Sequence, residues 1–481
     1  MLHSINQPQN AVHTAYLLDN IQQIKSVKVF SKEKTYILEQ YQKNQCKSFC
    51  FNRLTHIEWL CIETIDNKQT PEQQLQQWRL AGYAQYQCAA NEKIETLQIV
   101  DYCENKQAAY AFVEGLLLSH YHYDKHKSKA KTLNNTGLQD VFVVSKYLSS
   151  KDCSNLQSIT DTVHWCRDLV NEPHNFQSAV QFAESLSAMA KTLSVKVEVL
   201  DKKRIETLRM GGLLGVNKGS VNPPTFTVLE YKPKVAKNKK PIVLVGKGLV
   251  FDTGGINIKT GDYMEDMKHD MAGGATVAAT LFAIARLKLN IHVVALIPAT
   301  DNRPNGNAMV PGDVITMSNG KTVEVVNTDA EGRLILADAL HYAKRYQPEL
   351  VIDAATLTGA ASRITGKYAI VAMQQHAERA MQQLIKSGWN TYERIVELPL
   401  WDDYAGDIKS PVADIKNSGS GTAGAITAGK FLTEFIDYPY IHLDIAGVAF
   451  VKSKDDYHYH GKQATGFGVR LLIDFMAHFL V

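Results

Sequence analysis

Two segments of the chain concentrate acidic and lysine side chains among glycines. The first, GKGLVFDTGGINIKTGDYMEDMKHDMAGGATV, covers residues 246–277, and the second, NTDAEGRLILADAL, covers residues 327–340. Glycine lets the backbone approach a neighbour closely, and a buried carboxylate is costly unless a cation compensates it. The two segments therefore indicate carboxylate chemistry that requires positive charge, supplied by lysines or by divalent metal ions.

In the first segment, the residues that could do chemistry stand at the expected ends of secondary-structure elements. Lys247 and Asp252 lie around the end of the strand-like run PIVLVG, and Lys259 lies in a glycine-flanked loop. Asp270 comes just before a helix that we expect to begin near Ala272. These positions favour a site built at the carboxyl ends of strands.

In the second segment, Asp329, Glu331 and Arg333 alternate along the chain after the strand-like run TVEVVN. Side chains in an extended segment switch faces at each residue. If the strand geometry persists that far, all three side chains point the same way. We therefore expect two carboxylates and one cation to converge here.

The acidic residues singled out in the two segments supply four carboxylates, those of Asp252, Asp270, Asp329 and Glu331, which exceeds what a single catalytic metal with an open position generally uses. This number favours two metal ions over one. Taken singly, however, each acidic residue is more typical of a solvated surface. Phosphate-binding enzymes on the same kind of sheet remain the main alternative from the residues alone.

The elements that would position these residues alternate between strands and helices. From residue 195 onward, strand-like runs such as VKVEVL, TFTVLEY, PIVLVG, IHVVALIP and LVIDAATL are separated by helical stretches such as residues 275–287 and 332–345. This alternation predicts an α/β fold with a central mixed, mostly parallel sheet flanked by helices. Several runs are continuously apolar, as expected of strands that helices cover on both faces.

The length of 481 residues exceeds the size at which single hydrophobic cores stop growing, so we expect more than one domain. We place an N-terminal domain at residues 1–150, a linker helix at residues 151–172 and the catalytic domain at residues 173–481. The first 150 residues carry no dense cluster of Gly, Asp and Lys. We expect them to act as a scaffold.

Composition excludes several classes of protein. The chain is 45% hydrophobic and 21% charged, with a formal charge of +3, so neither disorder nor a strong field for nucleic acid or acidic membranes is indicated. The start, MLHSINQPQNAV, lacks the pattern of a signal peptide, and no apolar run has the length of a membrane span. All seven cysteines lie in the first 166 residues, and we expect reduced core residues in a cytoplasmic protein.

Three other patterns are weaker. GSGTAG at residues 419–424 matches the dinucleotide pattern, but no buried strand precedes it as that site requires. The histidine-rich stretches at residues 120–126 and 457–460 match no structural zinc spacing. We interpret the first as a glycine-rich loop and the other two as polar surface.

The motifs of the two segments at residues 246–277 and 327–340 resemble those of a known family. NTDAEGRL is the signature of the leucyl (cytosol) aminopeptidases, two-metal metallo-exopeptidases, and VGKG, FDTGG, INIKTG and MKHDMAGGA occur in that family's order and spacing. Further likeness runs through RDLVNEPHN, MGGLLGVNKGS, PATDNRPNGNAMVPGDV, YAGDIKSPVADIKN, HLDIAGVAF and ATGFGVRLL. The resemblance covers roughly residues 160 to 478, and it implies a smaller N-terminal α/β domain that helps to build a homo-hexamer.

The resemblance also implies how two metal ions per subunit, zinc or manganese, would be held. Lys247, Asp252, Asp270 and Glu331 would bind the tight metal, and Asp252, Asp329 and Glu331 the exchangeable one. A water or hydroxide between the ions would attack the scissile carbonyl of a peptide. Because an ammonium cannot coordinate a metal, Lys247 would have to be neutral, as nearby cations favour.

The family resemblance also implies roles for residues that would not bind the metals. Lys259 would stabilise the developing oxyanion, and Arg333 would hold a bicarbonate that serves as general base. The pocket for the N-terminal side chain, suited to leucine and other apolar residues, would be formed by Met267, Asn327, Ala330, Thr356 and Gly359. The expected function is removal of single residues from the free N-terminus of peptides during intracellular peptide turnover.

Two other classes of function compete with this one. The first is a phosphate or nucleotide enzyme on the same sheet, and the second is a nucleic-acid or scaffolding protein whose enzyme site is idle. An idle site would need at least one lost ligand, and no position of the expected ligand set is replaced. The sequence motifs therefore favour the peptidase.

Overall fold

The computed structural model describes residues 1–64, 68–128, 137–452 and 457–479. Within them the chain forms two compact units. The first unit holds residues 1–161 and 457–461, and the second holds residues 162–452 and 462–479. Helix α5 (Ser150–Asn171) spans the boundary between the two units in the sequence.

The first unit contains a six-stranded sheet in the order β1-β6-β5-β2-β4-β3. All neighbouring strands are parallel except the β3–β4 pair, which is antiparallel. The strands are β1 (Leu2–Ser4), β2 (Thr14–Leu18), β3 (Ser48–Asn52), β4 (Ile57–Ile62), β5 (Thr96–Asp101) and β6 (Asp140–Val144). The N-terminal part of the chain is thus itself an α/β structure.

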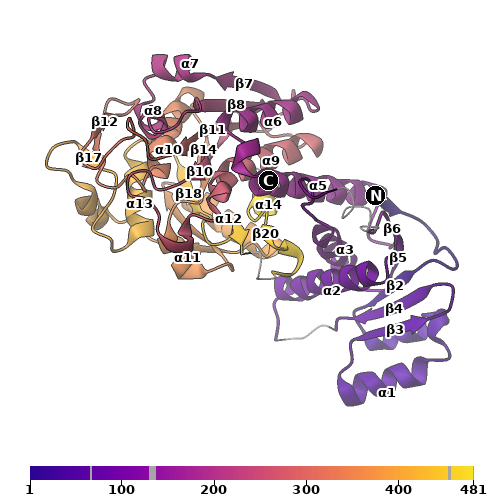
Figure 1. The fold of residues 1–481 in the computed structure, drawn as a ribbon. Helices are drawn as coiled ribbons and strands as arrows, with labels where there is room; N and C mark the ends of the chain where they lie inside the picture. The colour runs from indigo at the N-terminus through magenta and orange to yellow at the C-terminus, as the bar shows by residue number, and fades with distance from the viewer. Residues whose placement is uncertain (65–67, 129–136, 453–456, 480–481) are drawn as a thin grey trace. The chain divides into compact units, whose positions relative to one another are not determined.

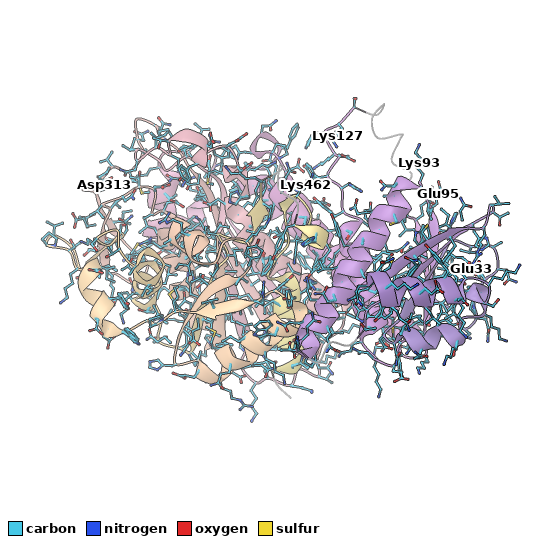
Figure 2. All side chains as sticks on the ribbon, turned by 90° about the horizontal axis from the view of Figure 1, so that it is seen from below. Glu33, Lys93, Glu95, Lys127, Asp313 and Lys462 are labelled. Atoms are coloured by element: carbon cyan, nitrogen blue, oxygen red, sulfur yellow. The ribbon has the colours of Figure 1, made fainter. Side chains whose placement is uncertain are left out.

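Helices cover both faces of this sheet. Helices α2 (Pro71–Asn91) and α3 (Ala108–Ser119) pack on the face that includes Trp59 and Ile99, and α1 (Lys34–Asn44), with the short turns η1 (Ile21–Lys25) and η2 (Lys28–Phe30), packs on the other face. Figure 2 shows Lys93 and Glu95 just beyond the end of α2, where the chain turns into β5.

The second unit contains a nine-stranded sheet in the order β16-β15-β18-β14-β9-β11-β8-β7, with β10 paired to β11. Parallel pairs form its centre, and β15–β18, β8–β11 and β7–β8 are antiparallel. The expected mixed, mostly parallel sheet is confirmed. Its strands are β7 (Lys196–Leu200), β8 (Thr225–Tyr231), β9 (Ile242–Gly246), β10 (Gly248–Asp252), β11 (Val293–Asn302), β14 (Leu350–Ala355), β15 (Ile370–Gln375), β16 (Ile395–Glu397) and β18 (Tyr440–Asp444).

Helices flank the large sheet, as its continuously apolar strands require (Figure 1). Helix α9 (Ala272–Arg286) packs against β9, β11 and β14, and α14 (Val469–His478) packs against α9 and α12 (Glu378–Thr391). Helices α10 (Gly332–Ala343) and α13 (Gly424–Thr433) share a hydrophobic core with Val243 and Val245 of β9. The remaining helices are α6 (Ala179–Lys191), α7 (Lys202–Thr207), α8 (Gly211–Asn217) and α11 (Gly359–Thr365).

Four parallel strands of this sheet end at one edge, because β9, β11, β14 and β18 run in the same direction. Strand β10 joins that edge through its parallel pairing with the last residues of β11. The residues at or just beyond these ends are Lys247, Asp252, Asn302, Thr356 and Asp444. The fold therefore brings together the ends of chain segments that are far apart in the sequence.

One expected strand is shorter than predicted. The run TVEVVN forms β13 (Thr322–Glu324), which lies in a separate small sheet with β12 (Val314–Thr316) and β17 (Ile415–Lys416). A second small sheet pairs β19 (Phe450–Val451) with β20 (Gln463–Ala464). Extended geometry therefore does not persist from β13 to Arg333, which lies in α10.

Among the described residues, no helix combines the length and the apolar character needed to cross a bilayer. All seven cysteines are free. Cys50 and Cys88 are exposed, so the expectation that every cysteine is a core residue was wrong for these two.

Candidate metal centre

Three carboxylates converge at the carboxyl edge of the large sheet. One oxygen from each of Asp252, Asp329 and Glu331 lies within 4.8 Å of the others. Asp252 and Glu331 are buried, whereas the Asp329 side chain retains 33% of its exposure. Such a cluster has the geometry to hold a divalent cation between oxygen ligands.

Asp329 and Glu331 reach this position through a turn, and the alternation that we expected along an extended strand was the wrong reason. Glu331 has helical backbone angles, φ −74° and ψ −35°, and is the N-cap of α10. Arg333 consequently points elsewhere, because it stands within the first helical turn. The two carboxylates converge as predicted, and the cation does not join them by the predicted route.

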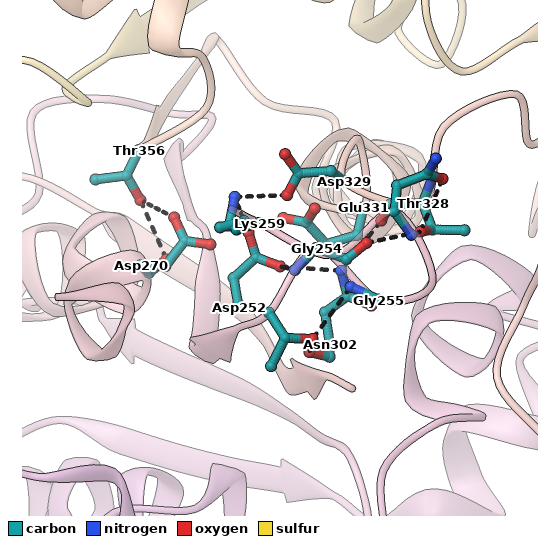
Figure 3. A network of polar contacts seen from close by, with 12 residues as sticks. Asp252, Gly254, Gly255, Lys259, Asp270, Asn302, Thr328, Asp329, Glu331 and Thr356 are labelled. Carbon is teal, nitrogen blue, oxygen red and sulfur yellow. Dashed lines mark hydrogen bonds and ion pairs between the residues drawn. The ribbon is translucent and has the colours of Figure 1, made fainter. Parts of the chain in front are cut away.

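Lys259 bridges two of the carboxylates (Figure 3). Its Nζ lies 2.7 Å from Asp252 Oδ2 and 2.5 Å from Asp329 Oδ1. The loop that carries Lys259 is fastened by Thr328, whose hydroxyl donates to Gly254 O at 2.6 Å and accepts from Asn257 N at 2.8 Å. These hydrogen bonds join the loop of Lys259 to the segment that carries Asp329.

Lys247 lies on the other side of Glu331. Its Nζ is 2.7 Å from Asp270 Oδ2, 3.1 Å from Glu331 Oε1 and 3.0 Å from the carbonyl oxygen of Thr356. Glycine at position 332 makes room for this side chain, because a Cβ there would lie 2.6 Å from Lys247 Cε. The Thr356 hydroxyl donates to Asp270 Oδ1 at 2.7 Å. These residues form a buried network of their own, beside the contacts that Lys259 makes with Asp252 and Asp329.

Asn302 is a member of the site that the sequence reasoning did not single out. It pairs with Asp252 across β10 and β11, and its Nδ2 donates to Asp252 Oδ1 at 2.9 Å and to Thr328 O at 3.1 Å. The backbone N–H of Gly254, a residue with φ +83°, also donates to Asp252 Oδ1, at 2.8 Å. The position of Asn302 at the end of a buried apolar run was the signal in the sequence.

The electrostatics of the network reflect crowded like charges in a buried place. Burial and the neighbouring carboxylates raise the pKa of Asp329, against the opposing effect of Lys259. Burial likewise raises the pKa of Asp270, while Lys247 lowers it. Burial lowers the pKa of Lys247 and Lys259, but the surrounding carboxylates outweigh burial and raise both. Divalent cations would act in the opposite direction on every one of these groups.

The donor set fits a divalent cation and offers further ligand atoms beside it. Asp252, Asp329 and Glu331 offer carboxylate oxygens at one position, and Glu331 Oε2 is buried without a hydrogen-bond partner among the described residues. Asp270 and Lys247 offer further ligand atoms on the far side of Glu331. Metal ions bound here would relieve the repulsion among these carboxylates and satisfy the buried oxygen.

Arg333 is buried and separate from the carboxylate cluster. Its Nη1 donates to the carbonyl oxygen of Asn417 at 2.6 Å, and its Nε has no hydrogen-bond partner within the described part of the chain. Burial lowers the pKa of Arg333 to about 10, partly offset by Glu331 and Asp444, so the guanidinium is charged at neutral pH. A buried charged donor of this kind is suited to a small oxyanion.

The five residues expected to form the side-chain pocket are distributed over three segments. Met267 lies in η5 (Met267–Met271), Gly359 begins α11, and Thr356 lies two residues before the α11 cap. Asn327 and Ala330 belong to the turn before α10, where Asn417 Nδ2 donates to the Asn327 carbonyl at 2.7 Å. Of the five, Thr356 contacts the proposed metal ligands directly, through Asp270 and Lys247.

Comparison with known proteins shows the family of the chain. The model of the cytosol aminopeptidase family, catalytic domain, matches residues 164–473, and the chain belongs to that family. The "Probable cytosol aminopeptidase" of Chlorobium phaeobacteroides is 45% identical over 384 residues, which are 76% of this chain and 75% of the relative. That of Chloroherpeton thalassium is 52% identical over 313 residues, 64% of this chain and 60% of the relative.

The similarity in structure extends over nearly the whole chain. A solved structure of the bottromycin maturation enzyme BotP in complex with Mn superposes with a TM-score of 0.84 at 27% sequence identity. The superposition covers 98% of this chain and all of that one. Both units are therefore similar in fold to parts of a solved relative. The sequence matches, in contrast, span about 60% of the length of some curated relatives.

Proposed function

We propose that the protein is a metal-dependent aminopeptidase that hydrolyses the N-terminal peptide bond of peptides, preferring leucine and other apolar N-terminal residues. The observation that carries the proposal is the convergence of Asp252, Asp329 and Glu331 beside Lys247 and Asp270. Membership of the cytosol aminopeptidase family supports it. The proposed setting is peptide turnover in the cytoplasm.

The residues divide into two overlapping ligand sets. We assign Lys247, Asp252, Asp270 and Glu331 to the tighter ion, and Asp252, Asp329 and Glu331 to the exchangeable one. Divalent ions held there supply an activated water and polarise the scissile carbonyl. Zinc and manganese both suit this donor set, and the Mn complex of BotP supports manganese.

Lys259 is suited to stabilise the oxyanion that develops as the carbonyl is attacked. An ammonium has three N–H donors, and the carboxylates of Asp252 and Asp329 accept two of them. The third donor remains for the substrate oxygen. The surrounding carboxylates favour the charged form of Lys259, as this role requires.

Arg333 is suited to hold a bicarbonate that accepts a proton from the attacking water. The support is its buried Nε, which has no partner among the described residues, and its charge at neutral pH. A bicarbonate held by this guanidinium would serve as the general base.

The preference for apolar residues rests on the proposed pocket. Met267, Thr356 and Gly359 present a thioether, a hydroxyl already bonded to Asp270, and no side chain. None of these three residues offers a cation, and burying an acidic substrate side chain unpaired is costly. From the family resemblance we also propose that the protein assembles as a homo-hexamer and that residues 1–150 contribute to the assembly. Light scattering, which measures the mass of the assembly, tests this proposal.

Hydrolysis of a leucyl chromogenic amide tests the proposed function. Activity should be abolished by a chelator and restored by Mn²⁺ or Zn²⁺. Chelator-resistant hydrolysis, or none at all with either metal, would contradict a metal-dependent aminopeptidase.

A further inference from the structure

A buried carboxylate outside the proposed ligand sets stands at the same edge of the sheet. Asp444 is the last residue of β18 and pairs in register with Ala355, the last residue of β14. The residue is 1% exposed. The chain that continues from β14 therefore passes directly beside this carboxylate.

Asp444 is bonded to that continuing segment, residues 356–358. Its Oδ1 accepts the backbone N–H of Leu357 at 3.1 Å, and its Oδ2 accepts the hydroxyl of Thr358 at 2.7 Å. Oδ1 also accepts the N–H of Ala446 at 3.2 Å, which fixes the carboxylate relative to its own strand. Both oxygens of Asp444 are thus used to hold backbone and side chain of one short segment.

The same segment holds one side of the metal centre. The Thr356 carbonyl accepts from Lys247 Nζ at 3.0 Å, and the Thr356 hydroxyl donates to Asp270 Oδ1 at 2.7 Å. Asp252 and Asp329, on the other side, take their contacts from Lys259, Gly254 and Asn302. The position of segment 356–358 therefore determines the positions of the Lys247 and Asp270 side chains in particular.

We propose that Asp444 is a positioning residue, which acts through segment 356–358 to hold Lys247 and Asp270 in the geometry that binds the tighter of the two metal ions. This inference rests on the proposed function, because that function supplies the metal ions. Groups that orient metal ligands through hydrogen bonds typically change metal affinity by 10- to 100-fold when they are removed. Asp444 stands one step further from the metal than such a group, behind Thr356.

Two substitutions of Asp444 separate its hydrogen bonds from its charge. Asp444→Ala removes all three contacts. Asp444→Asn keeps Oδ1 for the N–H groups of Leu357 and Ala446, and its Nδ2 can donate to the Thr358 hydroxyl, which also accepts the N–H of Ala361. The asparagine variant therefore loses the negative charge while it retains the connections to segment 356–358.

Mn²⁺ titration of the full-length variants by calorimetry, in bicarbonate-free buffer and without substrate, measures the proposed effect. Asp444→Ala should weaken the tighter class of Mn²⁺ site by about tenfold or more and leave the weaker class within about twofold of wild type. Asp444→Asn should return the tighter class to within about threefold of wild type. An asparagine variant as weak as the alanine variant would overturn the hydrogen-bonded positioning role.

Asp338→Ala is the matched control. Asp338 of α10 is also fully buried, and it accepts backbone N–H groups from Leu213 at 3.0 Å and Ser318 at 2.9 Å, neither of which belongs to the site. This variant should lower thermal stability and keep both Mn²⁺ affinities. If it weakens Mn²⁺ binding as much as Asp444→Ala does, general destabilisation explains the result and the inference is wrong.

The outcomes separate this inference from the proposed function. Wild-type protein that binds two Mn²⁺ ions, together with a folded Asp444→Ala variant that binds both with wild-type affinity, overturns the positioning role alone. Wild-type protein that binds neither Mn²⁺ nor Zn²⁺ overturns the proposed function and this inference with it. Should the alanine variant fail to fold, Thr358→Val takes its place. It removes one of the three contacts, together with the hydroxyl that accepts the N–H of Ala361 at the start of α11. It should weaken the tighter class, and wild-type affinity there would overturn the proposal.

Discussion

Lys247 and Asp270 form a buried ion pair, with Nζ 2.7 Å from Oδ2, at the edge of the large sheet. Lys259 forms a comparable pair with Asp252, also at 2.7 Å. The two lysines stand twelve residues apart in the chain and serve different sides of the carboxylate cluster. The proposed function gives them different charges: Lys247 coordinates a metal as the neutral amine, and Lys259 works as the ammonium.

Substitution of the two lysines should therefore give different results. Lys259→Ala should lower kcat by about a hundredfold or more, the scale of losing one oxyanion donor, and keep two metal ions per subunit. Lys247→Ala should weaken the tighter metal. Metal analysis of the purified variants beside their kinetics checks both expectations, and loss of a metal in Lys259→Ala with both retained in Lys247→Ala would reverse the assignment.

Arginine at the same positions sharpens this test. Lys259→Arg keeps a positive charge and should recover part of the activity that alanine loses. Lys247→Arg should not recover metal binding, because a guanidinium does not release its proton at working pH. Recovery of the tighter metal by Lys247→Arg would show that charge, and not coordination, is the contribution of this residue.

Removal of single ligand charges should abolish turnover without unfolding the chain. Asp329→Asn and Glu331→Gln conserve side-chain volume, so neither creates a cavity, and each removes one charge from the cluster of three carboxylates. We expect native circular dichroism, a reduced metal content and no measurable hydrolysis. Normal metal content with normal activity in either variant would contradict the assignment of the site.

Substrate preference tests the proposed pocket separately from the metals. Leucyl substrates should exceed aspartyl ones in kcat/KM, because Met267, Thr356 and Gly359 offer no cation to an acidic side chain. Paired measurements on leucyl and aspartyl amides of the same leaving group decide this. Faster hydrolysis of the aspartyl amide would refute the pocket and leave the metal centre untouched.

Asp338 predicts a dependence of stability on pH. Burial raises its pKa to about 6 from the ordinary value of 3.8, against the effect of backbone N–H groups that favour ionisation. Because the folded-state pKa is the higher one, the folded state holds its proton more tightly, and stability falls as pH rises from about 4 to about 6. A shift of about two units corresponds to roughly 3 kcal/mol.

Comparison with Asp338→Asn isolates this group, since the asparagine does not titrate. The thermal midpoint of wild type, relative to that of the variant, should decrease between pH 4.5 and pH 7 and stay constant above. A constant difference across that range would show that Asp338 does not titrate there.

The sequence predicted the large sheet well because its strands carry their own signal. The runs PIVLVG and LVIDAATL are apolar throughout, and the strands within them, β9 and β14, are buried at every position. The predicted ends of these strands then placed Lys247 and Asp252 at the correct edge. Because parallel strands end at the same edge of a sheet, the expected parallel direction predicted that these residues lie close together.

The path of the second segment could not be predicted from periodicity. Asp329, Glu331 and Arg333 alternate in the sequence, yet the chain turns into α10 at Glu331, and Arg333 donates to Asn417 instead. Such a turn depends on partners that are distant in sequence, among them Asn257 and Asn417. Asp444 was not found for the same reason, since two of its partners, Leu357 and Thr358, lie in the segment that follows β14 and are distant in sequence.

The most direct test of the account is to locate the bound metal. Crystals of the protein loaded with Mn²⁺ should show two peaks in anomalous difference maps collected near the manganese absorption edge. One peak should lie among Asp252, Asp329 and Glu331, and the other should lie between Glu331 and the pair formed by Lys247 and Asp270. Fully loaded crystals without a peak among those residues, or with Mn²⁺ only elsewhere on the chain, would contradict the proposed two-metal site.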